Sequence, residues 1–200
     1  MILRRLFGYK YDGFFVDVGA HHPFRFSNTH YFYELGWSGI NIEPNPEGIS
    51  LIQSARPRDI CLQLGVSDCP GQLTYYQFDE PALNTFDYET VKAKVEENRY
   101  KLKSTCEVRV QRLDVILAEH LPENQKIDFL SIDVEGLDLS VLKSNNWEIY
   151  RPRFILIEML NTSLEDVLRS EIYSFMKQQH YVLLAKTCNT LIFKNDKYSS

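Results

Sequence analysis

Acidic residues end several apolar runs of this sequence, at positions where they could bind a ligand. Asp17 lies in the β-branched and aromatic run 14–18, and Glu43 directly follows the short apolar run 40–42. Asp133 ends a third run of the same kind. A carboxylate at a strand end accepts hydrogen bonds from a cation or from hydroxyl groups. The separation of Asp17 and Glu43 is close to the ~20-residue offset at which an acid binds a ribose hydroxyl in dinucleotide-type folds.

Two small residues, Gly19 and Ala20, follow the first apolar run, and two histidines come next. Gly19 permits a tight turn and lets a ligand approach the backbone closely. In an open α/β sheet, ligands bind at the carboxyl ends of the strands. We therefore expect this turn to border a binding site, although the stretch alone is equally compatible with an ordinary core strand and its turn.

The composition is that of a globular chain and excludes several classes of protein. With 200 residues, 44% of them hydrophobic, the chain is expected to form a single domain over 1–200 with a real core. The net charge of −5 argues against a general nucleic-acid binder. The four cysteines form no Cys-x-x-Cys pair, so we expect free thiols in the cytoplasm. No apolar run approaches the ~20 residues that span a bilayer, and the N-terminal run is too short for a signal peptide.

Strands and helices alternate in the first third of the chain. The pattern predicts strands at 14–18, 40–42 and 59–64, with helices at 28–35 and 47–55 between them. Such alternation is typical of parallel, right-handed strand–helix–strand units. The fold class predicted is therefore α/β.

Residues 66–126 interrupt this rhythm. Segments 72–78 and 106–113 read as strands, and 87–103 reads as a charged helix. The apolar content of this region is too low for a core of its own. We therefore expect an insertion or cap within the single domain, turning at 65–68 from the third strand.

The strand–helix rhythm then returns and ends in a hairpin. The expected elements are a strand at 127–133, a helix at 137–144, a strand at 153–158, an amphipathic helix at 163–180 capped by Ser163 and Asp166, and hairpin strands at 181–186 and 190–193.

Four motifs in order carry a family resemblance. They are residues 15–23 (Phe-Val-Asp-Val-Gly-Ala-His-His-Pro), 36–46 (Gly-Trp-Ser-Gly-Ile-Asn-Ile-Glu-Pro-Asn-Pro), 127–136 (Ile-Asp-Phe-Leu-Ser-Ile-Asp-Val-Glu-Gly), and Trp147 with 150–158 (Tyr-Arg-Pro-Arg-Phe-Ile-Leu-Ile-Glu). Each motif alone is weak, but the set, which spans roughly 13–160, resembles the FkbM family of S-adenosylmethionine-dependent methyltransferases.

The resemblance implies a Rossmann-like class I methyltransferase fold. Such a fold has a mostly parallel seven-stranded sheet with helices on both faces and an antiparallel last strand, here one arm of the hairpin at 181–193. The resemblance also implies methyl transfer from S-adenosyl-L-methionine to an oxygen, often a sugar hydroxyl in polysaccharide or natural-product biosynthesis. The implied partner is a small-molecule or glycan acceptor.

The resemblance also assigns cofactor-binding residues. Asp17, Gly19 and Ala20 would line the methionine end of the cofactor, Glu43 with Pro44 would bind the ribose hydroxyls, Gly65, Val66 and Ser67 would border the adenine, and Asp133 would lie near the methyl group. An alternative for Glu43 is that it only complements the dipole of the helix at 47–55.

Catalysis by such an enzyme demands mainly positioning, because a sulfonium methyl group is already activated. Asp133 and Glu135 end the fourth strand, where acceptor and methyl group must meet, and a base is needed only as the hydroxyl proton leaves. We expect Asp133 or His21 to be that base, with His22 nearby. The wider superfamily commonly has glycines where these histidines stand, which favours a role for them at the acceptor. Both histidines are equally compatible with a purely structural role.

A metal site is a further alternative at the same place. Asp133, Glu135, Glu158 and the two histidines could hold magnesium or manganese, which prefer hard oxygen ligands. No local spacing is diagnostic of a metal, so a divalent ion is not expected.

Part of the insertion, segment 79–105, is predicted to close over the acceptor, with breaks at Pro81, Asn84 and Asn98 where it could hinge. Its basic residues would attract an acceptor that carries phosphate or carboxylate, unless the helix is simply a solvated surface. These residues are Lys92, Lys94, Arg99, Lys101 and Lys103.

Two other classes of protein share this strand–helix pattern but fit the sequence less well. A Rossmann-type NAD(P)-binding oxidoreductase would need a G-x-G-x-x-G turn for the pyrophosphate, and the sequence lacks one. A non-catalytic cofactor-binding module is disfavoured because the acids at 17, 43 and 133 are intact.

Overall fold

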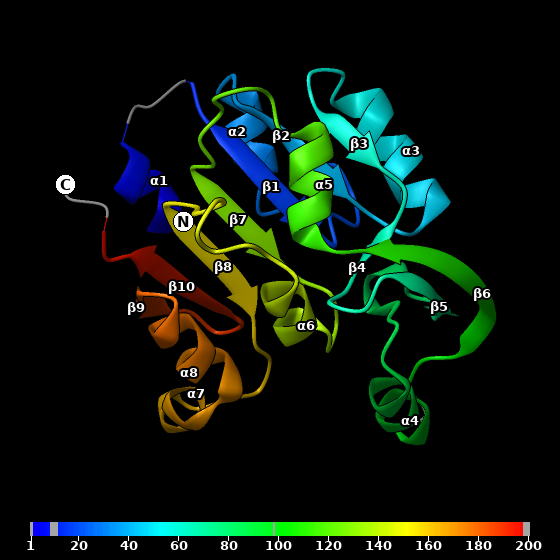
Figure 1. Cartoon of the computed structure of the whole chain (residues 1–200). Helices are drawn as coiled ribbons and strands as arrows, with labels where there is room; N and C mark the ends of the chain where they lie inside the picture. Colours follow the sequence, from blue (N-terminus) through cyan, green and yellow to red (C-terminus); the bar gives the residue numbers. More distant parts are fainter. Residues whose placement is uncertain (1, 9–11, 98, 198–200) are drawn as a thin grey trace.

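The computed structural model describes residues 2–8, 12–97 and 99–197 and is built around one seven-stranded sheet (Figure 1). The strand order is β3-β2-β1-β7-β8-β10-β9. The strands are β1 (Phe14–Val18), β2 (Ser38–Ile42), β3 (Ile60–Leu62), β7 (Phe129–Ile132), β8 (Phe154–Glu158), β9 (Tyr181–Lys186) and β10 (Thr190–Asn195). The first five in spatial order pair in parallel, whereas β10 runs antiparallel to both β8 and β9. This is the Rossmann-like class I methyltransferase arrangement that the sequence predicted.

Helices cover both faces of this sheet. They are α1 (Ile2–Phe7), α2 (His30–Glu34), α3 (Pro46–Ala55), α5 (Leu113–His120), α6 (Asp138–Lys143), α7 (Leu164–Arg169) and α8 (Glu171–Gln178). Alternate residues of a strand point to opposite faces, so Val16 joins the core under α5, α6 and α8 while Phe15 joins the core under α1 and α2. The second core is mainly aromatic, and Phe7 of α1 contacts Trp37 at 5.0 Å and Phe154 at 5.2 Å between ring centroids, both edge to face.

A smaller sheet departs from this layered body, and Figure 1 shows it extending away from the carboxyl end of β3. Its order is β4-β6-β5, formed by β4 (Gly65–Val66), β5 (Gly71–Phe78) and β6 (Leu102–Gln111). A 3₁₀ turn η1 (Pro81–Leu83) and helix α4 (Tyr88–Glu96) lie between β5 and β6 in the sequence. We call residues 71–111 the cap.

The helix expected at 87–103 is shorter than its charge pattern indicated. Helix α4 ends at Glu96, and residues 102 and 103 belong to β6. Here Leu102 pairs with Phe78 and Ser104 with Gln77 of β5. Pairing with the distant strand β5 outweighs the local helical preference of these residues. Sequence periodicity does not reveal such pairing.

Helix α5 was not expected, and it shortens the insertion. Leu113 was assigned to a strand, yet it begins α5, and Leu113, Ile116 and Leu117 are buried in the main core. Their spacing is that of a helix face. The region that interrupts the strand–helix rhythm therefore ends near Gln111 instead of 126.

The single helix expected at 163–180 is two helices, because Ser170 ends α7 and caps α8 by accepting a hydrogen bond from the Tyr173 amide. The predicted start is correct: Ser163 and Asp166 form a reciprocal capping box. All four cysteines are free. Among the described residues, no helix combines the length and apolarity that a membrane crossing requires.

Candidate active site

A cavity of about 260 Å³ lies where the carboxyl ends of β1, β2, β7 and β8 meet the cap. Several residues expected at the site line it: Asp17, Gly19, Ala20, His21, Glu43, Pro44, Gly65, Val66, Asp133 and Glu135. The cap contributes residues 81–86. His22 and Ser67 are outside this lining set.

The turn after β1 is held against the neighbouring strand ends. The amides of Gly19 and Ala20 donate to the carbonyl oxygen of Ile42, at 2.9 and 3.2 Å. Gly19 has a φ of +82°, and a Cβ there would lie 1.8 Å from the Asp133 carbonyl oxygen. Glycine is required because the backbones after β1 and β7 nearly touch.

Glu43 forms one wall of the cavity and is only 5% exposed. Its two oxygens accept hydrogen bonds from the amides of His21 and Asn45, both at 2.8 Å. Burial raises the pKa of Glu43 to about 7, and the two amides oppose that rise. Asn45, not Glu43, caps α3, so the carboxylate keeps lone pairs for further hydrogen bonds.

Asp17 anchors the loop that follows it. Thr29 donates to the carboxylate of Asp17 at 2.8 Å, and Arg56 donates to the hydroxyl of Thr29 at 2.8 Å. Arg56 is 1% exposed and also donates to Ser27 and to the Pro23 carbonyl. Burial raises the pKa of Asp17, while Thr29 and Arg56 lower it. The sequence indicated neither Thr29 nor Arg56, whose partners lie 12 to 33 positions away.

The two histidines have different surroundings. The His21 ring lines the cavity and stacks on Phe26 at 6.5 Å, and its Nε2 has no hydrogen-bond partner among the described atoms. Burial, with His22 and Arg25 nearby, lowers the pKa of His21, so its imidazole is neutral at pH 7. His22 instead accepts the amides of Phe24 and Arg25 with its Nδ1 and shapes the loop.

Three carboxyl groups converge at the ends of β7 and β8. One oxygen each of Asp133, Glu135 and Glu158 lies within 4.8 Å of the others. Burial, together with the charge of Glu158, raises the pKa of Asp133 to about 9. Burial also raises the pKa of Glu158, but the hydrogen bond from Asp133 lowers it. The directions of these shifts favour a proton on Asp133, whose side chain donates to Glu158.

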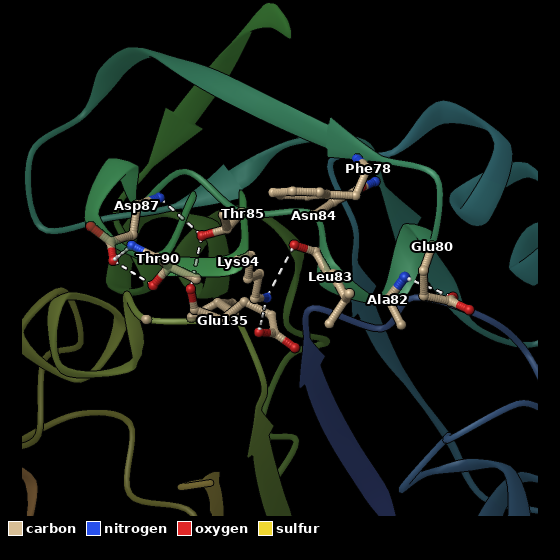
Figure 2. A network of polar contacts seen from close by, with 12 residues as sticks. Phe78, Glu80, Ala82, Leu83, Asn84, Thr85, Asp87, Thr90, Lys94 and Glu135 are labelled. Carbon is tan, nitrogen blue, oxygen red and sulfur yellow. Dashed lines mark hydrogen bonds and ion pairs between the residues drawn. The ribbon is translucent and has the colours of Figure 1, made fainter. Parts of the chain in front are cut away.

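A lysine of the cap neutralises the third carboxylate (Figure 2). The Lys94 Nζ lies 2.6 Å from Glu135 and 3.3 Å from the Leu83 carbonyl oxygen. The two side chains of the ion pair are only 15% and 13% exposed. A divalent cation would compete with this ammonium for Glu135, and we assign no metal here. The available sequence signal was helical spacing: Lys94 lies three residues after Val91, the buried residue of α4.

The wall between β4 and the cap is apolar. Leu64, Val66 and Phe86 line it, and Phe86 packs so closely on Gly65 that a Cβ there would be 2.7 Å from its ring. Ser67 turns away from this wall, and its hydroxyl lies 3.2 Å from that of Ser140 on α6.

Comparisons with known proteins give a family match over most of the chain. Residues 17–183 match the sequence model of the methyltransferase FkbM domain. Among solved structures, a precorrin-6y C5,15-methyltransferase from Geobacter metallireducens GS-15 aligns over 91% of this chain and 79% of its own, with 12% identity and a TM-score of 0.40. A search of curated protein sequences found no match. Since the FkbM match covers most of the chain, including the acids at the ends of β2, β7 and β8, the protein belongs to the FkbM family of methyltransferases.

Proposed function

We propose that the protein methylates an oxygen, using S-adenosyl-L-methionine, and that its acceptor is a sugar hydroxyl. The observation that supports this proposal best is the division of the cavity into two ends. Glu43, with His21 beside it and an apolar wall, forms one end, and the clustered carboxyl groups of Asp133, Glu135 and Glu158 form the other.

The first end has a hydrogen-bond acceptor and an apolar surface that fit the cofactor. The Glu43 carboxylate would accept hydrogen bonds from the ribose hydroxyls, as a second use of oxygens already fixed by two amides. The wall of Leu64, Val66 and Phe86 would take the adenine. The turn at 19–20 beside Asp17 would border the methionine end. When bound, S-adenosylmethionine supplies an activated methyl group.

The second end fits a neutral, hydroxyl-bearing acceptor. Carboxylates accept hydrogen bonds from hydroxyls and orient them. The net charge of this cluster is low, because Asp133 carries a proton and Lys94 balances Glu135. A polyol would therefore bind here without a large electrostatic penalty, and Asp133 and Glu135 would position the reacting oxygen.

In this proposal the cap acts as a lid over the cavity. Residues 81–86 line the cavity, and an ion pair of 2.7 Å joins Glu80 of the cap to Arg25 of the loop after β1. Closure of 79–105 would exclude water, which competes with the acceptor. Since Lys92 is exposed and Lys94 is paired, attraction of an anionic acceptor is not part of the proposal.

Calorimetry and a methylation assay test the function separately. We expect S-adenosylmethionine to bind and NAD not to bind. A panel of methyl hexopyranosides and 6-deoxyhexopyranosides is then incubated with the cofactor, and products are sought by a mass increase of one methylene group. Preferential binding of NAD would contradict the methyltransferase assignment. If amines are methylated and no glycoside of the panel is, the sugar acceptor is wrong.

A further inference from the structure

Two lysines of α4 make ion pairs of similar length in different surroundings. Lys92 pairs with Glu89 at 2.7 Å on the exposed surface of the helix. Lys94 pairs with Glu135 at 2.6 Å in a largely buried position, beside the Asp133–Glu158 pair. An ion pair is screened far less when it is buried, so only Lys94 is placed to influence the charges of the cavity.

The cap is closely joined to the loop that carries Glu135 (Figure 2). The Thr85 hydroxyl donates to the Glu135 carbonyl oxygen at 2.8 Å. Gly136, next in the chain, packs so tightly that a Cβ there would lie 2.9 Å from the Thr90 hydroxyl and 3.1 Å from Asp87. Lys94 therefore reaches the carboxyl cluster only when the cap is docked on this loop.

Of the three clustered carboxyl groups, Glu158 is the one that neither pairs with Lys94 nor donates a proton to a neighbour. Lys94 balances Glu135, and Asp133 holds a proton that it donates to Glu158. Burial and the charge of Glu135 raise the pKa of Glu158, whereas Asp133 and Lys94 lower it. Glu158 also lines the cavity. All three clustered acids line the cavity, but Lys94 pairs with Glu135 and Asp133 is the acid whose pKa is raised to about 9, so Glu158 is the remaining candidate for accepting a proton from a ligand.

We propose that Glu158 takes up the proton of the acceptor hydroxyl and that Lys94, brought by the docked cap, supports Glu158 in this role through its positive charge. The inference rests on the proposed function. The acceptor O–H bond breaks and its proton moves to a Glu158 oxygen. The electron pair left on the acceptor oxygen forms the bond to the methyl carbon, while the pair of the broken methyl–sulfur bond stays on sulfur and neutralises the sulfonium. Glu158 afterwards releases the proton to water.

Lys94 is a positioning residue in this scheme, and Glu158 is the catalytic one. The titratable groups that surround Glu158 are Asp133, Glu135, Asp138 and Lys94. Asp133, which with His21 was one of the two bases expected from the sequence, has its pKa raised to about 9 and in this scheme orients Glu158.

A titration of the ligand-free full chain tests the electrostatic half without any acceptor. Glutamate is labelled with ¹³C at its carboxyl carbon, and the Glu158 signal is identified by its loss in Glu158→Gln. We expect Glu158 to be ionised at pH 7 in the parent protein. Lys94→Met should shift its titration to higher pH, Lys94→Arg should restore it, and Lys92→Met should leave it unchanged. A protonated Glu158 at pH 7, or a titration that Lys94→Met does not move, would overturn the proposal.

Turnover on the methyl glycoside panel tests the chemical half. Glu158→Gln should lower kcat by about 10²–10⁴-fold, the usual contribution of a general base, with cofactor affinity unchanged. In Lys94→Met, turnover should fall about tenfold at pH 6 and recover toward pH 9. This is expected because the positive charge of Lys94 no longer depresses the pKa of Glu158. Full turnover in Glu158→Gln, or a pH-independent loss in Lys94→Met, would contradict the assignment. Failure of the parent to bind S-adenosylmethionine would instead contradict the proposed function.

Discussion

Glu43 shows how a single buried carboxylate can be prepared for a ligand. Its two oxygens are fixed by the amides of His21 and Asn45, so the turn after β1 and the start of α3 share one anchor. A carboxylate oxygen that accepts one hydrogen bond can accept another. Binding of hydroxyls at this position would then require no rearrangement of the side chain.

Replacing Glu43 by alanine should weaken S-adenosylmethionine binding by about 1–3 kcal/mol, the range for loss of charge-assisted hydrogen bonds. Calorimetry of the folded variant measures this effect. The matched control is Glu47→Ala, which removes an exposed acid four residues away on α3. Equal affinities in parent and Glu43→Ala would remove Glu43 from the cofactor site.

Asp133 is expected to make stability depend on pH. Its pKa is raised to about 9 in the folded protein, whereas the unfolded chain has the ordinary value near 4. Its favourable contribution is therefore complete below about pH 4 and is lost as pH rises toward 9. Asp133→Asn keeps a donor for Glu158 and removes this loss.

The Asp133→Asn variant should match the parent in free energy of unfolding near pH 4 and exceed it by roughly 5 kcal/mol at pH 8, because pH 8 lies about four units above the unfolded pKa and each unit is worth ~1.4 kcal/mol. Urea denaturation at the two pH values gives the comparison. A variant that is less stable than the parent at pH 8 would show that Asp133 is ionised in the folded state.

At the scale of residues, the sequence predicted the acids of the site better than their partners. Glu43 and Asp133 could be found because carboxylates that end apolar runs lie at the same edge of a parallel sheet. Arg56 and Lys94 could not be found in this way. Their roles depend on loops and on the cap, whose placement is set by contacts between residues 27 and 41 positions apart.

At the scale of elements, local sequence patterns predicted the strands and helices that bury one face. They failed where pairing with a distant strand determines the secondary structure. The main sheet and most of its helices follow from apolar runs and their caps. The strand at 106–113 was predicted, but residues 102 and 103 were assigned to the helix 87–103, and they begin β6 because β5 offers a partner strand. Helix α5 was not predicted, because its apolar residues directly follow the alternating pattern of β6 and the first of them, Leu113, was read as part of that strand.

The joint between α4 and the loop after β7 gives an element-scale prediction. Gly136→Ala should weaken cap docking, because it adds a methyl group 2.9 Å from the Thr90 hydroxyl at a φ of +114°. Hydrogen exchange of amides 85–96 should become faster by about tenfold or more, reflecting a docking loss of at least ~1.4 kcal/mol.

Gly71→Ala is the matched control for this joint. Gly71 also has a positive φ, +147°, but its Cβ would meet nothing within 4 Å. Backbone strain is therefore common to both variants, and only the methyl group added by Gly136→Ala meets other side chains, those of Thr90 and Asp87. If the two variants change exchange in 85–96 equally, strain alone would explain the effect and the packing of Gly136 would not matter for docking.

At the scale of the whole molecule, the cavity lies between the main sheet and the cap, and these two parts are held in place by different kinds of contact. The sheet side is fixed by a core on both faces, and the carboxylates at its edge are held by parallel pairing. The cap side rests on polar contacts, two ion pairs among them: Arg25–Glu80 and Lys94–Glu135. Elements held mainly by polar contacts open at lower free energy than core elements, so the cap is the side on which opening is expected.

Limited proteolysis should reveal such opening as a change in the cap alone. Trypsin has exposed sites at Arg99, Lys101 and Lys103 in the cap and at Lys126 outside it. With S-adenosylmethionine and a methylated member of the glycoside panel both present, cleavage within 79–105 should slow several-fold, while cleavage at Lys126 should keep its rate. The physical reason is mass action: ligands that contact residues 81–86 bind the docked cap and lower the open population by the factor 1 + [L]/Kd. Protection that is equal at both places would indicate global stabilisation, and no protection under saturating ligand would mean that the cap is a fixed surface and not a lid.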